Sequence, residues 1–191
     1  MSERTSRGYM VQSVARYIDG TYDDEARRQI LGRIDPDVRR MMESVNPVAW
    51  YPVQDVAKIF AAIAGHHEAT DGNPRQALEN VGRSIAEMAT TTFLKLVLRI
   101  LTPALFASKM PQFWSRDNRC GTLRTVEFES GKKRLVATLD DVGDFDFIGA
   151  VAPGFLLFAL EHLGYKNVRV DYEWTPESAR ANSFRYELTW D

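Results

Sequence analysis

Two stretches near the end of the chain decide its fold: Asn167-Val168-Arg169-Val170-Asp171-Tyr172-Glu173-Trp174 and Phe184-Arg185-Tyr186-Glu187-Leu188-Thr189-Trp190. In each stretch large apolar residues alternate with polar ones. A period of two places the apolar set on one side of a sheet, so each stretch is predicted to be a strand. Each of these apolar side chains contributes roughly 1.5–3 kcal/mol when it is buried. Their shared face therefore requires a cover of other elements.

An apolar run precedes these strands, from Phe147 to Leu163, and stops at Gly164. Its composition suits a helix, interrupted by Pro153-Gly154. A membrane-spanning helix needs about 20 consecutive apolar residues, and no stretch of this chain reaches that length. The run is therefore predicted to be a buried helix, and no membrane span is expected.

Upstream of this run the pattern changes at Cys120. Residues 121–129 and 132–139 have the character of strands around a Ser130-Gly131 turn. Helical patterns fill the chain before that point. They cover residues 9–18, 23–31, 35–42, 53–64, a long stretch from 74 to an end at Thr102-Pro103, and 104–110. The strand pairs therefore follow a block of helices.

This order of elements predicts an α+β fold. A helical layer packs on an antiparallel four-stranded sheet, which is made of two hairpins separated by a helix. No repeat, low-complexity segment or linker divides the sequence, and its 191 residues suit one domain. We expect a single domain over residues 8–191 and a disordered tail over residues 1–7.

Composition excludes some classes of function. The net charge of -2 gives no general attraction to nucleic acid or to an anionic membrane. The N-terminus lacks the apolar core of a signal peptide. The single cysteine, Cys120, has no internal partner for a disulfide. Together these features favour a cytoplasmic protein that binds no nucleic acid.

Several motifs resemble a known superfamily of ligand-binding domains. They are Trp50-Tyr51-Pro52, Phe93-Leu94-Lys95-Leu96 with the helix end at Thr102-Pro103, Phe113-Trp114 before Arg119-Cys120-Gly121, Gly154 in the late helix, Leu160-Glu161-His162-Leu163-Gly164 at its end, and the terminal strand Phe184 to Trp190. This superfamily includes haem nitric-oxide-binding sensor domains, 4-vinyl-reductase-type domains and TRAPP vesicle-tethering subunits, and the likeness is nearest to a bacterial paralogous family. The resemblance implies a helical layer on a sheet, with apolar ligands or haem between them and with dimers formed through helices in some members.

Haem requires an axial ligand, usually a histidine facing a pocket. The chain offers His66, His67 and His162, all placed at predicted helix ends. The haem-sensor family also carries a Tyr-x-Ser-x-Arg motif, which no tyrosine of this chain begins. The sequence therefore predicts no cofactor, with haem disfavoured. No metal is predicted either, because His66 and His67 are adjacent and one cysteine cannot form a cysteine-rich zinc site.

Two groups of residues are candidates for binding. Aromatic residues of the helices are candidates to line a pocket between helices and sheet, with an ordinary core as the alternative: Trp50, Tyr51, Phe60, Phe93, Phe106, Phe113 and Trp114. Basic residues on or beside the first hairpin are candidates to contact an anion: Arg116, Arg119, Arg124, Lys132, Lys133 and Arg134. The alternative for the basic group is a solvated strand end that pairs with Glu127 and Glu129.

These patterns favour a non-enzymatic sensory or regulatory domain that binds an apolar or amphipathic small ligand or a protein partner. The alternative is a homodimeric scaffold or interaction module with a filled core. An enzyme of the vinyl-reductase type is a third interpretation. It ranks last because no catalytic motif accompanies the fold. A homodimer is expected because the helices at 9–18 and 53–64 have apolar flanks that the sheet does not cover.

Overall fold

A computed structural model describes residues 3–90, 101–143, 145, 147–173 and 182–191. The helices among them are α1 (Gly8–Thr21), α2 (Asp24–Gly32), α3 (Pro36–Glu43), α4 (Val53–Thr70), α5 (Pro74–Ala89), α7 (Pro103–Asp117) and α8 (Ala152–His162). The strands are β1 (Thr5–Arg7), β2 (Trp50–Pro52), β3 (Thr122–Glu129), β4 (Arg134–Asp140), β5 (Arg169–Asp171) and β6 (Phe184–Thr189). Single 3-10 turns occupy Ser130–Lys132 and Gly149–Val151.

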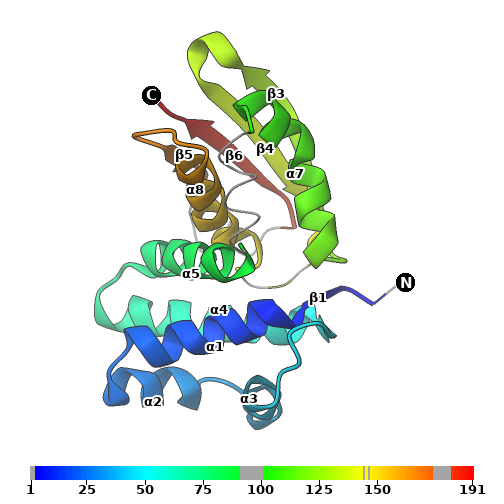
Figure 1. Ribbon diagram of the computed structural model, residues 1–191. Coiled ribbons are helices and arrows are strands. Elements are labelled where there is room, and N and C mark those ends of the chain that lie inside the picture. Colours follow the sequence, from blue (N-terminus) through cyan, green and yellow to red (C-terminus); the bar gives the residue numbers. More distant parts are fainter. Residues whose placement is uncertain (1–2, 91–100, 144, 146, 174–181) are drawn as a thin grey trace.

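The main sheet is antiparallel and has the strand order β3-β4-β6-β5 (Figure 1). Its two hairpins are separated in sequence by α8, so the α+β fold predicted from the sequence is confirmed. Leu135 pairs with Leu188, and Val170 pairs with the same Leu188 from the other side. Val170, Tyr172, Tyr186 and Leu188 are all buried, as the alternation of their stretches predicts.

Helices α7 and α8 cover the apolar face of the sheet, with α7 against β3 and α8 against β5 (Figure 1). The hydroxyl of Tyr186, a fully buried residue of β6, donates a hydrogen bond to the Gly149 carbonyl at 2.8 Å. This bond ties the centre of the sheet to the start of α8. Gly164 ends α8 in the left-handed region, at φ 90°, where glycine has no Cβ penalty.

Helix α5 lies between the N-terminal helices and the helices that cover the sheet. It contacts α1 and α4 on one side and α8 on the other (Figure 1). At the crossing with α8, a Cβ on Gly82 would overlap the carbonyl oxygen of Val151, and a Cβ on Gly154 would overlap that of Glu79. The backbones of α5 and α8 therefore touch, and only glycine fits at these two positions.

The N-terminal segment differs from expectation. We predicted a disordered tail over residues 1–7, but Thr5–Arg7 forms β1, which pairs antiparallel with β2. Ser6 also forms an isolated bridge with Asn118, and the amide of Arg119 donates to the Thr5 carbonyl. Two segments, β2 and residues 118–119, thus pair with the backbone of β1. The local composition of residues 1–7 does not predict this pairing.

Helix lengths also differ from the predicted ones. Helix α5 ends at Ala89, well before the expected end at Thr102-Pro103, and residues 91–100 lie outside the described residues. Helix α7 runs on to Asp117 rather than stopping near Met110. The Thr102 side chain caps it by accepting from the Leu105 amide. Pro111 lies inside α7, so the proline did not end this helix.

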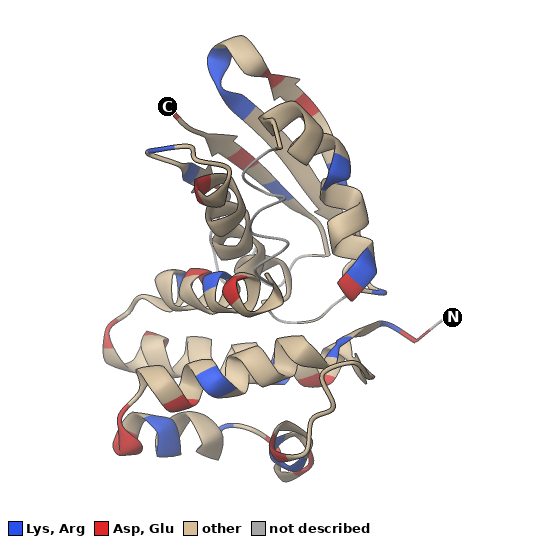
Figure 2. Ribbon diagram, viewed as in Figure 1, with Lys and Arg blue, Asp and Glu red and all other residues tan. Residues whose placement is uncertain are grey.

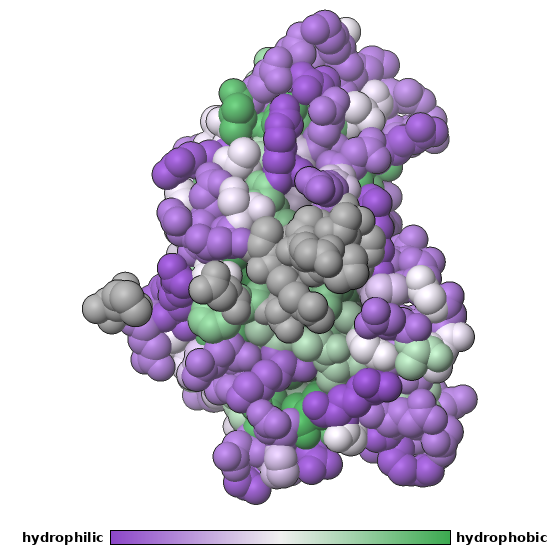
Figure 3. All heavy atoms as spheres, turned by 180° about the vertical axis from the view of Figure 1, so that it is seen from behind, coloured by the Kyte–Doolittle hydropathy of each residue, from purple (hydrophilic) through white to green (hydrophobic). Residues whose placement is uncertain are grey.

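The outer face of the sheet carries paired charges. Arg134 contacts Glu127, Glu129 and Glu187, which join three neighbouring strands. Charged residues of both signs are scattered among the described elements (Figure 2), and hydrophilic side chains cover most of the face seen in Figure 3. Among the described residues, no helix has the length and apolar character needed to cross a membrane.

Candidate functional site

An apolar cavity of about 60 Å³ lies where α1, α4, α5, α7 and α8 meet. Most of its wall is aliphatic or aromatic. The lining residues are Ser6, Tyr9, Met10, Val56, Phe60, Gly82, Ile85, Phe106, Met110, Phe113, Trp114, Asp117, Asn118, Leu123, Ile148, Val151, Ala152, Phe155 and Leu156. The cavity therefore sits between the N-terminal helices and the layer that covers the sheet.

Helical spacing explains how α7 presents its side of the cavity. Phe106, Met110, Phe113 and Trp114 recur at intervals of three and four residues, which places them on one face of the helix. Phe106 and Phe113 pack with ring centroids 6.3 Å apart. The opposite wall comes from α1 and α5, through residues that include Tyr9, Met10 and Ile85.

One end of the cavity is polar. The Ser6 hydroxyl donates to Asn118 Oδ1 at 2.9 Å, and both residues are buried. Tyr9 and Asp117 also line the cavity, and Asp117 Oδ2 accepts from Arg116 Nε at 2.9 Å. Burial raises the pKa of Tyr9 well above its ordinary value, and the negative charge of Asp117 raises it further. Tyr9 is therefore a neutral hydrogen-bonding group at neutral pH.

The predicted pocket residues divide into three groups. Phe60, Phe106, Phe113 and Trp114 line the cavity. Trp50 and Tyr51 do not line it, because β2 pairs with β1 and directs the Trp50 ring onto Arg7 and Arg119. The Tyr51 hydroxyl instead accepts from the Asn46 amide at 2.8 Å. Phe93 lies outside the described residues.

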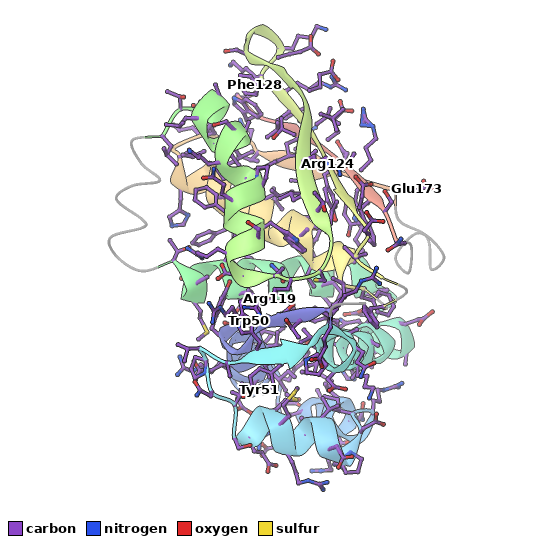
Figure 4. The ribbon with its side chains drawn as sticks, turned by 90° about the vertical axis from the view of Figure 1, so that its right-hand side faces the viewer. Trp50, Tyr51, Arg119, Arg124, Phe128 and Glu173 are labelled. Atoms are coloured by element: carbon purple, nitrogen blue, oxygen red, sulfur yellow. The ribbon has the colours of Figure 1, made fainter. Side chains whose placement is uncertain are left out.

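The predicted basic group does not form one cluster. Arg116 is paired with Asp117, Arg124 lies 3.9 Å from Asp140, and Lys132 contacts Glu129 at 2.6 Å. Arg134 is held by the glutamates of the sheet, and Lys133 adopts the left-handed conformation that turns the hairpin. Arg119 stands apart from these on the Trp50 ring, while Arg124 lies on the sheet (Figure 4).

Sequence reasoning missed several lining residues. Tyr9, Met10, Ile85 and Leu156 belong to predicted helices, but no local signal separates a cavity wall from a filled core. The signal that was available is the aromatic content of α7. Its three aromatic residues, Phe106, Phe113 and Trp114, all line the cavity.

The histidines and the cysteine lie outside the cavity wall. Burial lowers the pKa of His66, whose Nδ1 has no hydrogen-bond partner in the described part of the chain. His67 contacts the Tyr22 hydroxyl at 2.8 Å and Asp71 at 2.7 Å, and His162 stacks on Phe158 with centroids 3.9 Å apart. Burial raises the pKa of Cys120 to about 11, so its thiol is not activated.

The described residues hold no group of three histidine, cysteine, aspartate or glutamate side chains arranged to bind a metal ion.

Comparison with known proteins identifies the fold. No protein-family model and no curated protein matches the sequence. The chain is similar to the unliganded Fe(II) H-NOX protein of K. algicida, in a mutant form, with a TM-score of 0.72, 10% identity, and coverage of 97% of this chain and 96% of that one. It is also similar to a mutant T. Tengcongensis H-NOX, with a TM-score of 0.65, 12% identity and 97% of each chain covered.

A third similar structure is described as "Modulating Heme Redox Potential Through Protein-Induced Porphyrin Distortion"; it has a TM-score of 0.62, 12% identity, and coverage of 96% of this chain and 99% of that one. These neighbours contradict the prediction of no cofactor with haem disfavoured, which was based on the positions of the histidines and on a missing sequence motif. A motif can be absent while the fold that houses haem is present.

The cavity residues offer a limited set of atoms to a haem iron. All three histidines of the chain lie elsewhere, so a histidine-held haem does not fit this cavity wall. The lining residues with a possible ligand atom are Tyr9, Met10 and Met110. The comparisons thus show a fold shared with haem nitric-oxide-binding domains, and the likeness to vinyl-reductase and TRAPP proteins stays a prediction.

Proposed function

We propose that this protein is a sensory or regulatory domain that binds a small apolar molecule in the cavity between its N-terminal helices and the helices that cover the sheet. The observation that carries the proposal is the apolar cavity with one polar end, formed by Ser6, Tyr9 and Asn118. Sensor domains of H-NOX type have the same fold, which supports a sensory role. The buried, unactivated thiol of Cys120 supports a non-enzymatic function.

The size of the cavity limits what enters it without rearrangement. A volume of about 60 Å³ is about twice the share of one water molecule in the liquid. Larger ligands require side chains to move, and Met10 and Met110 in the wall are unbranched and adaptable. We therefore propose a ligand of few heavy atoms, or a larger one that displaces these methionines.

Thermal-shift titration and native mass spectrometry test this proposal, with indole, short alcohols, a fatty acid and haemin as probes. We expect at least one probe to bind and to raise the melting temperature. Ala152→Phe fills the cavity and should abolish the shift, whereas Ala61→Phe, on a helix surface outside the cavity wall, should keep it. For haemin, the Soret absorption gives a second reading. If no probe shifts the native protein, the ligand-binding function is wrong.

A second candidate function is an interaction module without a ligand. The observation that favours it is the same volume, which is below the few hundred cubic ångströms typical of ligand sites. For this function, filling the cavity with Ala152→Phe should leave binding of a protein partner unchanged. The predicted homodimer belongs to this proposal, and light scattering at micromolar concentration tests it.

A further inference from the structure

Two arginines stack on one tryptophan at the boundary between the two parts of the molecule. The Arg7 guanidinium carbon lies 4.1 Å from the Trp50 ring centroid, and that of Arg119 lies 3.9 Å from it. Arg7 ends β1, Trp50 begins β2, and Arg119 follows α7. Figure 4 shows Arg119 beside Trp50, between the N-terminal helices and the sheet. Three segments far apart in the sequence thus build one surface feature.

Within the described residues, neither guanidinium has a carboxylate partner. Arg7 donates one bond, to the Val48 carbonyl at 2.6 Å, and Asp117 is paired with Arg116. Arg134, by contrast, is surrounded by three glutamates. Two positive charges are therefore held against the same ring with no compensating acid, an arrangement that costs free energy unless an anion approaches.

The surroundings of this stack have the composition of a protein-binding surface. Arg119 is exposed, and Val48, held beside Arg7, is 73% exposed. Tryptophan and arginine are the residues enriched at the energetic centres of protein interfaces. The net charge of -2 gives no wider positive field for nucleic acid. These features together favour a protein segment over a polyanion.

We propose that the surface formed by Arg7, Val48, Trp50 and Arg119 is the docking site of an acidic protein segment that also carries an apolar residue. Carboxylates of the partner pair with the two guanidiniums, which the indole already holds in place. The apolar residue packs on Val48. This proposal does not depend on a ligand in the cavity.

Fluorescence anisotropy with a labelled peptide of alternating Glu and Leu residues tests the docking site. The full-length native protein should bind it, and added salt should weaken the binding. Arg7→Gln and Arg119→Gln should each weaken binding about threefold, and the double variant about tenfold. Arg28→Gln changes an exposed arginine on α2, away from the stack, and should bind as the native protein does.

A matched peptide with Gln in place of Glu separates the contribution of charge pairing to binding from that of hydrophobic contacts. It should bind at least about threefold more weakly than the Glu peptide. Equal binding of the two peptides, or native-like binding by the double variant, would overturn the proposal. If the native protein binds neither peptide and the double variant melts at a lower temperature, the stack is a structural clamp and the proposal is wrong.

Discussion

Helix α5 makes two contacts that differ in how they are packed. Toward α8 it presents Gly82 against Val151, and Gly154 of α8 meets Glu79, so the two backbones touch. Toward α1 and α7, Ile85 borders the apolar cavity. The first contact has no room for a methyl group, and the second has room for a small molecule. The same helix is therefore close-packed on one side and borders an adaptable cavity on the other.

Gly154→Ala, in the close contact between α5 and α8, is expected to have the largest effect. The new methyl group would overlap the Glu79 carbonyl, which is backbone and cannot rotate away, so α5 and α8 must separate. We expect a loss of more than about 4 kcal/mol in the free energy of unfolding, measured by urea denaturation.

The control for this variant is Gly20→Ala in α1, where a new Cβ meets nothing within 4 Å. Alanine has the higher helix propensity, so this variant should gain about 0.5–1 kcal/mol. Equal effects of the two substitutions would show that the α5–α8 contact is not close-packed.

Two leucines one turn apart on α8 differ in whether they border the cavity. Leu160 is fully buried away from the cavity wall, whereas Leu156 lines the cavity. We expect Leu160→Ala to cost about 3–4 kcal/mol and Leu156→Ala about 2–3 kcal/mol, because a side chain beside empty space has fewer packing contacts to lose. Urea denaturation measures both values. A larger cost for Leu156→Ala would mean that the cavity is filled in solution.

A smaller effect is expected where the sheet meets α8. Tyr186→Phe removes the hydroxyl that donates to the Gly149 carbonyl and keeps the ring. The loss should be about 1–2 kcal/mol, since a buried acceptor is left without its donor. Phe184→Leu, on the same strand, provides a comparison that changes packing but no hydrogen bond. An unchanged melting temperature for Tyr186→Phe would show that water replaces the phenol.

The smallest effect is a pH dependence at the far end of α4. Burial lowers the pKa of His66 from its ordinary value of 6.5, with the charges of His67 and Arg33 adding to the effect. Above pH 6.5 the imidazole is neutral in both states. Below it the unfolded chain takes up the proton more readily, so the free energy of unfolding should fall as the pH drops.

His66→Phe keeps a ring against Tyr22, whose centroid lies 5.8 Å from that of His66, and removes the titration. The melting temperature of this variant should decline less between pH 6.5 and lower pH than that of the native protein. Because desolvation is the largest cause, the difference should persist at high salt. Equal slopes would show that His66 is solvated.

Much of the fold was predictable because local patterns specify it. Strict alternation placed β6, and Gly164 placed the end of α8. Of the alternating stretch 167–174, the structure has a strand over Arg169–Asp171, and Trp174 lies outside the described residues. The pairing of β1 with β2 was not predictable, because it depends on Asn118 and Arg119 from a distant segment.

The candidate site was predictable only in part. Aromatic residues of α7 identified one wall, but Trp50 was assigned to the pocket and instead stacks on arginines, since sequence alone does not show which face of a short strand meets the core. The cofactor prediction failed for a related reason. It relied on the positions of the histidines and on one missing motif, whereas the fold of the whole chain resembles that of the H-NOX structures.

A crystal structure of the protein under xenon pressure tests directly whether the apolar cavity is open to a small ligand. Xenon enters dry apolar cavities without needing a polar partner. We predict a xenon atom in the cavity between Phe60, Met110 and Leu156 of the native protein, and none there in Ala152→Phe. Absence of xenon from this cavity in the native crystal, or ordered water in its place, would contradict a dry ligand site among these helices.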